Sequence, residues 1–388
     1  MPKIVISGYY GFANAGDEAM LWAMVSALRD RVSGAEIVVL SARPEHTRAE
    51  FDVQAVGRNS LPQICGALRG ADLLISGGGG LLQDVTSRWS IFYYLGIILL
   101  AKMFGCRVYL YGQGIGPLRT SLARGALRMV ANRADLISVR DVESRDELVR
   151  LKVWRPAIHV TADPALGLDT RGADRERGRR LLRAAGATGS DLVGISVRSW
   201  KGLRRIQAVV ARLGDYLAAE GWQVVLVPMQ YSEDLPVCRE VATLMQHPPV
   251  VLEERYPFWD LLAMTANFGL AVGMRLHFLI FAALAHVPLV GIAYDPKITR
   301  FMQQLELPAP LPADDLRFEE LKFQVDFAHR YREGVSFLLA ERVAERLEAE
   351  EPYHGKRHKL RTIIQLQARR VAAHVRGEAP YRSWIARW

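Results

Sequence analysis

Short apolar segments alternate with longer helical segments along most of this 388-residue chain. Such alternation predicts parallel β-sheets covered by helices on both faces, because each parallel strand is reached through a crossover helix. The first expected strands lie at residues 3–9, 36–41, 72–77, 107–112, 136–139 and 159–161. The alternation resumes with expected strands at residues 192–197, 223–227, 250–252, 269–272 and 288–293.

The length and the strand pattern together predict two Rossmann-like domains. A single core rarely grows beyond about 250–300 residues, and half of this chain is hydrophobic. The expected parts are a first domain at 1–168, a linker and entry helix at 169–190, a second domain at 191–316, a helix at 317–350 that packs across the junction, and a basic tail at 351–388. Two such sheets are expected to leave a ligand-binding cleft between their carboxyl edges.

Composition favours a cytoplasmic protein. Residues 3–7 are already typical of a strand, so no secretory signal is expected. The longest apolar run, residues 89–101, is shorter than the ~20 residues that span a bilayer. The three cysteines have no metal-ligand spacing and are expected to be reduced.

The net charge of +9 is concentrated in the tail. Residues 352–388 hold nine Lys or Arg and one acid, Glu378, together with Tyr381, Trp384 and Trp388. Basic residues with interfacial aromatics favour peripheral contact with an anionic membrane surface, and a solvated helix with a frayed end is an equal alternative. Nucleic-acid binding is not expected, because no recognised motif accompanies the charge.

The most informative stretch is Gly273–His277 with Tyr294–Lys297. Arg275 and His277 follow one apolar run, and Asp295 and Lys297 follow the next. Because the carboxyl ends of neighbouring parallel strands form one edge, where such sheets bind ligands, these side chains are expected to lie together. Arg, His and Lys at such an edge suit a small, multiply charged anion and a nearby proton transfer. A plain core histidine is the alternative for His277.

Two further arginines end expected strands. Arg140 closes the fifth strand of the first half and is expected to point toward the ligand, with a surface ion pair to Asp141 as the alternative. Arg198 ends the first strand of the second half in the same way and is a further candidate for binding an anion.

Three glycine-rich segments end strands of the first half, at residues 8–18, 76–84 and 112–117. Neither the dinucleotide fingerprint nor a P-loop is present. The four consecutive glycines Gly77–Gly80 are hard to explain by packing, so a ligand is expected to approach the backbone there. Asp17 is expected to cap a helix and to contact the ligand as well.

Taken in order, these motifs resemble those of the polysaccharide pyruvyl transferase family, and most closely its bacterial cell-wall branch, the CsaB-type enzymes. The matching segments are residues 8–11, 14–17, 76–84, 112–117, 138–140, 162–165, 273–277 and 294–297. The resemblance covers about residues 3–305 and leaves out the basic tail.

The resemblance implies a GT-B-like fold, phosphoenolpyruvate as donor and a sugar as acceptor. In the cell-wall branch, N-acetylmannosamine of a lipid-linked polymer precursor receives the pyruvate as a ketal, which serves in S-layer anchoring. No cofactor and no metal ion is implied. The nearest rivals are a nucleotide-sugar glycosyltransferase or epimerase on the same scaffold and a non-catalytic module that binds polymer or membrane.

Roles follow from the chemistry of this donor. His277 is expected to act as general acid, and the catalytic set is His277, Arg275, Arg140 and Lys297. The donor is expected to be bound by Arg140, Arg198, Arg275, Leu276, His277, Asp295 and Lys297. The acceptor sugar is expected over Asn14, Asp17, Gly78, Gly79 and Gln113. The base that takes the hydroxyl proton stays open between Asp17 and His277.

Overall fold

The computed structural model describes residues 1–85, 87, 89–168, 170 and 174–348. The described chain forms two compact units. The first contains Met1–Phe12, Met20–Leu168 and the last two described residues, Leu347 and Glu348, and the second contains Ala13–Ala19 and Asp169–Arg346. The predicted basic tail and part of the predicted linker lie outside the described residues.

The first unit is built on a parallel sheet of eight strands in the order β3-β2-β1-β4-β6-β7-β8, with β5 paired to β6. Its strands are β1 (Lys3–Ser7), β2 (Glu36–Ser41), β3 (Gln54–Gly57), β4 (Leu73–Ser76), β5 (Gly79–Leu82), β6 (Arg107–Ile115), β7 (Leu136–Val139) and β8 (Ala157–Val160). Its helices are α1 (Ala15–Arg31), whose first residues belong to the second unit, α2 (Pro44–Phe51), α3 (Leu61–Leu68), α4 (Ser90–Met103), α5 (Ser121–Ala131) and α6 (Val142–Arg150).

The second unit holds a parallel sheet of six strands in the order β11-β10-β9-β12-β13-β14. Its strands are β9 (Leu192–Ser196), β10 (Gln223–Leu226), β11 (Val250–Val251), β12 (Leu270–Gly273), β13 (Leu289–Ala293) and β14 (Leu311–Pro312). Its helices are α7 (Arg175–Ala184), α8 (Leu203–Ala219), α9 (Tyr231–Leu244), α10 (Phe258–Thr265), α11 (Leu276–Leu284), α12 (Pro296–Gln304), α13 (Phe318–Arg330) and the greater part of α14 (Arg332–Glu348).

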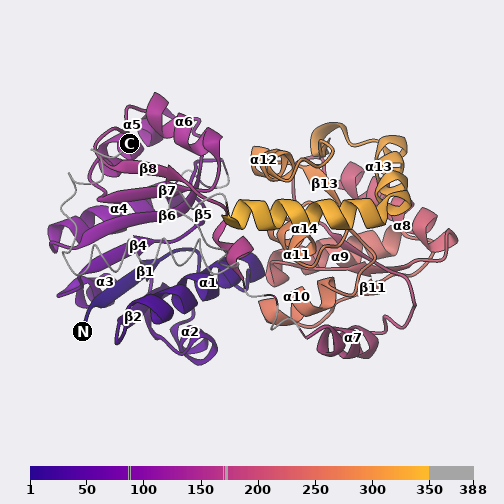
Figure 1. Ribbon diagram of the computed structural model, residues 1–388, viewed down its shortest axis with the longest axis horizontal. Coiled ribbons are helices and arrows are strands. Elements are labelled where there is room, and N and C mark those ends of the chain that lie inside the picture. The colour runs from indigo at the N-terminus through magenta and orange to yellow at the C-terminus, as the bar shows by residue number, and fades with distance from the viewer. Residues whose placement is uncertain (86, 88, 169, 171–173, 349–388) are drawn as a thin grey trace. The chain divides into compact units, whose positions relative to one another are not determined.

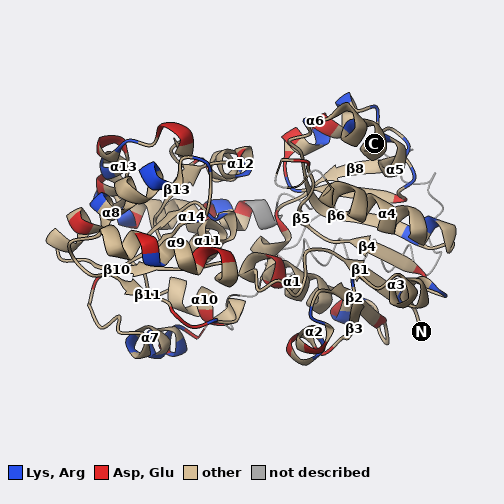
Figure 2. Ribbon diagram, turned by 180° about the vertical axis from the view of Figure 1, so that it is seen from behind, with Lys and Arg blue, Asp and Glu red and all other residues tan. Residues whose placement is uncertain are grey.

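Burial on both faces explains why the strands are short apolar runs. Central strands such as β4 and β9 are fully buried, and helices flank the strands of each unit (Figure 1). Charged residues lie on the helices and loops, while the strands are almost free of them (Figure 2). The alternation in the sequence therefore predicted the fold class correctly.

Several elements differ from the expectation. The segment 317–350 was expected as one helix, but its described part, residues 317–348, forms α13 and α14, because the backbone leaves helical geometry at Tyr331, with φ of −104° and ψ of 24°. The strand β3 and the helices α2 and α3 were not expected. Part of the glycine run forms β5, which continues the sheet beside β6. Among the described residues, none of the helices has the length and apolar character needed to cross a membrane.

Candidate functional site

The strand order of the second sheet marks a ligand-binding position. The chain runs outward from β9 to β10 and β11, and in the other direction from β12 to β13 and β14. In parallel sheets, ligands bind outside the carboxyl ends at such a reversal. Arg198 follows β9, and Arg275 and His277 follow β12 at this position. The next strand, β13, is followed by Tyr294, Asp295 and Lys297.

Arg275 is held by a buried carboxylate. Its Nε donates to Asp234 Oδ2 at 2.9 Å, and its second nitrogen contacts Asp234 Oδ1. Asp234 lies on α9, is fully buried and also accepts the backbone N–H of Gln230 at 2.9 Å. Burial acts to lower the pKa of the Arg275 guanidinium. The charge and the hydrogen bonds of Asp234 together outweigh burial, so the pKa is raised. Asp234 therefore positions the Arg275 side chain. No local sequence pattern predicted this role.

Tyr294 is the residue around which the other cations gather. Arg198 Nη1 donates to the Tyr294 hydroxyl at 2.6 Å, and the guanidinium carbon lies 4.4 Å from the ring centroid. Lys297 Nζ lies 4.9 Å from the same centroid. Burial acts to raise the pKa of Tyr294, yet the charges of Lys297, Arg198 and Arg275 lower it below its ordinary value. The sequence motif contained Tyr294, but no role was predicted for it.

Asp295 has a structural role at the start of α12. It is the residue before the helix, and its Oδ1 accepts the backbone N–H of Lys297 at 3.0 Å. Such a cap satisfies a backbone donor that the helix cannot pair. Asp295 therefore fixes the backbone from which Lys297 extends.

His277 packs against the first turn of α1. A Cβ atom at Gly16 would overlap the imidazole of His277, so the ring lies directly on the Gly16 backbone. Two backbone hydrogen bonds fix this turn in the second unit, from Ala15 N to Met229 O at 2.9 Å and from Tyr231 N to Ala13 O at 3.2 Å. His277 itself is half-buried, as the second residue of α11.

Two predicted acceptor residues share this turn. Asn14 precedes α1, and its Oδ1 accepts the N–H of Gly16 at 3.1 Å. Asn14 is therefore the helix cap, and the expectation that Asp17 caps the helix is wrong, because Asp17 already lies inside the first turn. Asp17 is 8% exposed. Asn14 and Asp17 thus belong to the same unit as His277 and Arg275.

Arg140 lies in the first unit and is buried. Its Nη1 pairs with Asp163 Oδ2 at 2.9 Å, whereas Asp141 Oδ2 is 3.9 Å from its Nε. The alternative of an exposed pair with Asp141 is therefore wrong, since all three side chains are buried. A Cβ atom at Gly114 would lie 2.8 Å from the guanidinium carbon, so the guanidinium packs against that backbone.

Packing explains part of the glycine run after β4. A Cβ atom at Gly77 would collide with the Tyr10 hydroxyl, and one at Gly78 would press on Pro164 and Met20. The argument that packing does not account for these glycines is therefore wrong for Gly77 and Gly78. The backbone of Gly79 has a φ of 100°, a conformation that residues with a side chain rarely adopt.

The predicted acceptor residue Gln113 is fully buried. Its amide nitrogen donates to the carbonyl oxygens of Ser76, at 3.0 Å, and of Gly77. These bonds tie β6 to the end of β4. Gln113 therefore holds the carboxyl end of β4 against β6.

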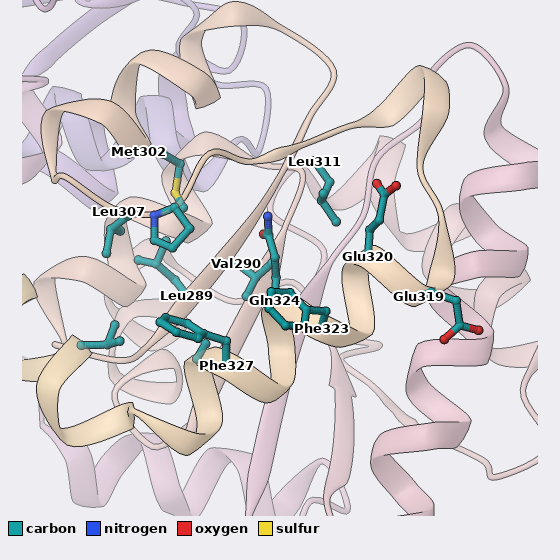
Figure 3. Close-up of a pocket in the computed structure, with 13 residues that line it drawn as sticks. Leu289, Val290, Met302, Leu307, Leu311, Glu319, Glu320, Phe323, Gln324 and Phe327 are labelled. Atoms are coloured by element: carbon teal, nitrogen blue, oxygen red, sulfur yellow. The ribbon is translucent and has the colours of Figure 1, made fainter.

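A cavity of about 560 Å³ in the second unit is apolar (Figure 3). Leu289 and Val290, at the amino end of β13, line it together with Met302, Phe323 and Phe327. Its lining contains no Arg, Lys or His within the described chain, so it does not suit an anionic ligand. The charged cluster lies at the opposite, carboxyl end of β13. In the described parts, no group of three or more His, Cys, Asp or Glu is arranged to hold a metal ion.

Solved structures share this fold at low sequence identity. Anabaena HepE in complex with UDP and glucose has a TM-score of 0.65 and 15% identity, covering 96% of this chain and all of that one. The S. aureus MnaA–UDP structure has a TM-score of 0.60 and 15% identity, covering 92% and 100%. The UDP-GlcNAc 2-epimerase from Neisseria meningitidis, bound to UDP-GlcNAc, has a TM-score of 0.61 and 10% identity, covering 88% and 99%. The fold is therefore GT-B-like, with two Rossmann-like units.

Sequence comparison identifies the family of this chain. The amylovoran biosynthesis protein AmsJ of Erwinia amylovora is 21% identical over 364 residues, covering 79% of this chain and 86% of that protein. The family model for polysaccharide pyruvyl transferases matches residues 14–296, which hold Asn14, Arg140, Arg275, His277 and Asp295. This chain belongs to the polysaccharide pyruvyl transferase family.

Proposed function

We propose that this protein transfers the pyruvyl group of phosphoenolpyruvate to a sugar as a ketal and releases phosphate. The observation that carries the proposal is the cluster of Arg198, Arg275 and Lys297 at the reversal of the second sheet, beside His277. Phosphoenolpyruvate carries a carboxylate and a phosphate, and such a cluster neutralises both without a metal ion. Membership of the family supports the same class of reaction.

The start of α11 adds to this donor site. Within the described residues, no side-chain oxygen caps the helix, whose first residue is Leu276. Backbone N–H groups at a helix start favour anions. Arg198 and Lys297 approach from neighbouring strand ends. We assign the donor carboxylate and phosphate to this group of donors in the second unit.

His277 is the general acid of the proposed reaction. Its proton goes to the methylene carbon of phosphoenolpyruvate, and a sugar hydroxyl attacks the central carbon. The second hydroxyl then attacks the same carbon, and the bond to phosphate breaks with its electron pair going to phosphate. Of the two hydroxyl protons, one restores the proton that His277 delivered, and the other leaves on phosphate. The product is a ketal that bridges two hydroxyls.

The acceptor is proposed to be N-acetylmannosamine in a lipid-linked precursor of a secondary cell-wall polymer. Asn14 and Asp17 support an acceptor position close to the acid, since their turn packs on His277. The protein would then act at the inner face of the cell membrane, and its product would serve in S-layer anchoring.

The experiment is incubation with phosphoenolpyruvate and saccharides that contain N-acetylmannosamine, read by phosphate release and by the mass of the product. The expected product gains the mass of pyruvate less one water. Parallel incubations with UDP-sugars provide the control, because the solved neighbours carry UDP or a UDP-sugar. Release of UDP without any release of phosphate from phosphoenolpyruvate would contradict the proposal.

A further inference from the structure

The hydroxyl oxygen of Tyr294 accepts a hydrogen bond from a group that has no acceptor capacity. Arg198 Nη1 donates to it at 2.6 Å, and a guanidinium group only donates. The Lys297 ammonium group lies 4.9 Å from the centroid of the same ring. A donor on the phenol oxygen and a nearby cation both stabilise the phenolate more than the phenol.

The charged groups around Tyr294 come from three elements and are cations. Arg198 follows β9, Arg275 precedes α11, and Lys297 lies in the first turn of α12. The neighbouring carboxylates have other partners. Asp234 binds Arg275, and Asp295 accepts the N–H of Lys297. Tyr294 is half-buried, with the Trp200 ring 4.8 Å away between centroids, so water screens these charges only in part.

We propose that the Tyr294 phenolate is the base that takes the proton from the attacking sugar hydroxyl. This inference rests on the proposed pyruvyl transfer and answers which group is the base. The hydroxyl O–H bond breaks, its proton forms the phenol O–H bond, and the sugar oxygen bonds to the central carbon of the donor. His277 delivers its own proton to the methylene carbon. The proton on Tyr294 then passes to His277, and the proton of the second sugar hydroxyl leaves on phosphate, which restores both groups.

Ultraviolet titration of the full-length protein tests the ionisation of Tyr294 without any substrate. Phenolate and phenol absorb differently, so the wild type minus Tyr294→Phe shows this one group. Burial raises the pKa of Tyr93, Tyr216 and Tyr256, so a tyrosine that ionises early stands out. We expect the difference to show ionisation below the ordinary pKa of about 10. Ionisation at or above that value would overturn the inference.

Kinetics distinguish a base from a residue that only holds Arg198 and Lys297. As a base, Tyr294 gives a rate that rises with pH through its pKa. Replacement by a fluorinated tyrosine lowers the phenol pKa and is expected to move that limb to lower pH. Tyr294→Phe is expected to lower kcat about 10²-fold or more, with little change in the KM for phosphoenolpyruvate. A raised KM with an unmoved pH limb would instead show a holding role and overturn the inference.

Tyr216→Phe is the matched control. Its ring also lies beside a lysine, with Lys322 Nζ 4.4 Å from the centroid, but on α8 and away from the strand ends. This variant is expected to keep the wild-type rate and pH profile. If the wild type transfers no pyruvyl group, both the proposed function and the base role fall. If transfer persists at the normal rate in Tyr294→Phe, the base role alone falls.

Discussion

The imidazole of His277 rests on the backbone of Gly16, although the two residues lie far apart in the sequence. This contact joins the predicted proton donor to the turn that carries Asn14 and Asp17. A side chain at position 16 and the present position of the imidazole exclude each other. The glycine is therefore explained by a close approach rather than by a turn that needs its flexibility.

Gly16→Ala is expected to lower kcat about 10²-fold. The added methyl group would overlap the His277 ring, so the ring must move away from its present position. Alanine is the better helix former, so the loss is not expected to come from α1 itself. Steady-state kinetics with phosphoenolpyruvate measure the effect. Gly125→Ala in α5 is the control, since a Cβ atom there meets nothing within 4 Å. Equal rates in both variants would show that the ring position is irrelevant.

Asp234→Asn is expected to lower the free energy of unfolding by about 3–5 kcal/mol, because it leaves the buried Arg275 charge with only the half-exposed Glu233 as partner, 3.7 Å away. Denaturant titration measures the loss. Glu253→Gln removes one partner of an exposed pair with Arg239 and is expected to cost about 1 kcal/mol or less. A loss no larger in Asp234→Asn than in this control would contradict the structural role of the pair.

Arg198→Ala is expected to raise the KM for phosphoenolpyruvate about 10–100-fold, as befits the loss of one charge-assisted hydrogen bond. The same variant is expected to raise the pKa of Tyr294, since one of its cations is removed. Arg212→Ala serves as the control, because Arg212 also stacks on an aromatic ring, 3.8 Å from the Phe318 centroid. An unchanged KM in Arg198→Ala would remove Arg198 from the donor site.

His277→Ala is expected to lower kcat about 10²–10⁴-fold while binding of phosphoenolpyruvate stays measurable. Calorimetric titration gives the binding and single-turnover kinetics give the chemical step. His277→Gln keeps a hydrogen-bonding side chain but has no proton that titrates, so it is expected to be similarly slow. A normal rate in either variant would exclude the acid role.

Truncation after residue 350 separates catalysis from contact with the membrane. Turnover of a soluble acceptor is expected to stay close to that of the full chain, whereas sedimentation with anionic vesicles is expected to fall, because the removed segment carries nine Lys or Arg and two acids, Glu351 and Glu378. Loss of turnover with an intact fold would place the tail in the site.

The sequence predicted what depends on local pattern. Apolar alternation located most strands, and the ends of β12 and β13 fall where Arg275 and Lys297 were expected to follow strands. Contacts between residues that are distant in the sequence produce no local pattern. Asp234 meets Arg275 across 41 positions, and the packing of Tyr10 against Gly77 depends on how β1 and β4 pair.

The position of the first turn of α1 was missed for a similar reason. Ala15–Ala19 are part of the same helix as the residues that follow them, yet Ala13–Ala19 belong to the second unit. Backbone hydrogen bonds to Met229 and Tyr231 fix the turn there, and backbone groups carry no sequence signature. The role of Tyr294 was hidden because an aromatic residue after a strand is usually part of a core.

The most direct test is a crystal structure of the full-length protein with bound phosphoenolpyruvate. The donor is expected beside the His277 imidazole, with its phosphate and carboxylate against Arg198, Lys297 and the start of α11. Density for phosphoenolpyruvate elsewhere, with none at this position under saturating donor, would contradict the account.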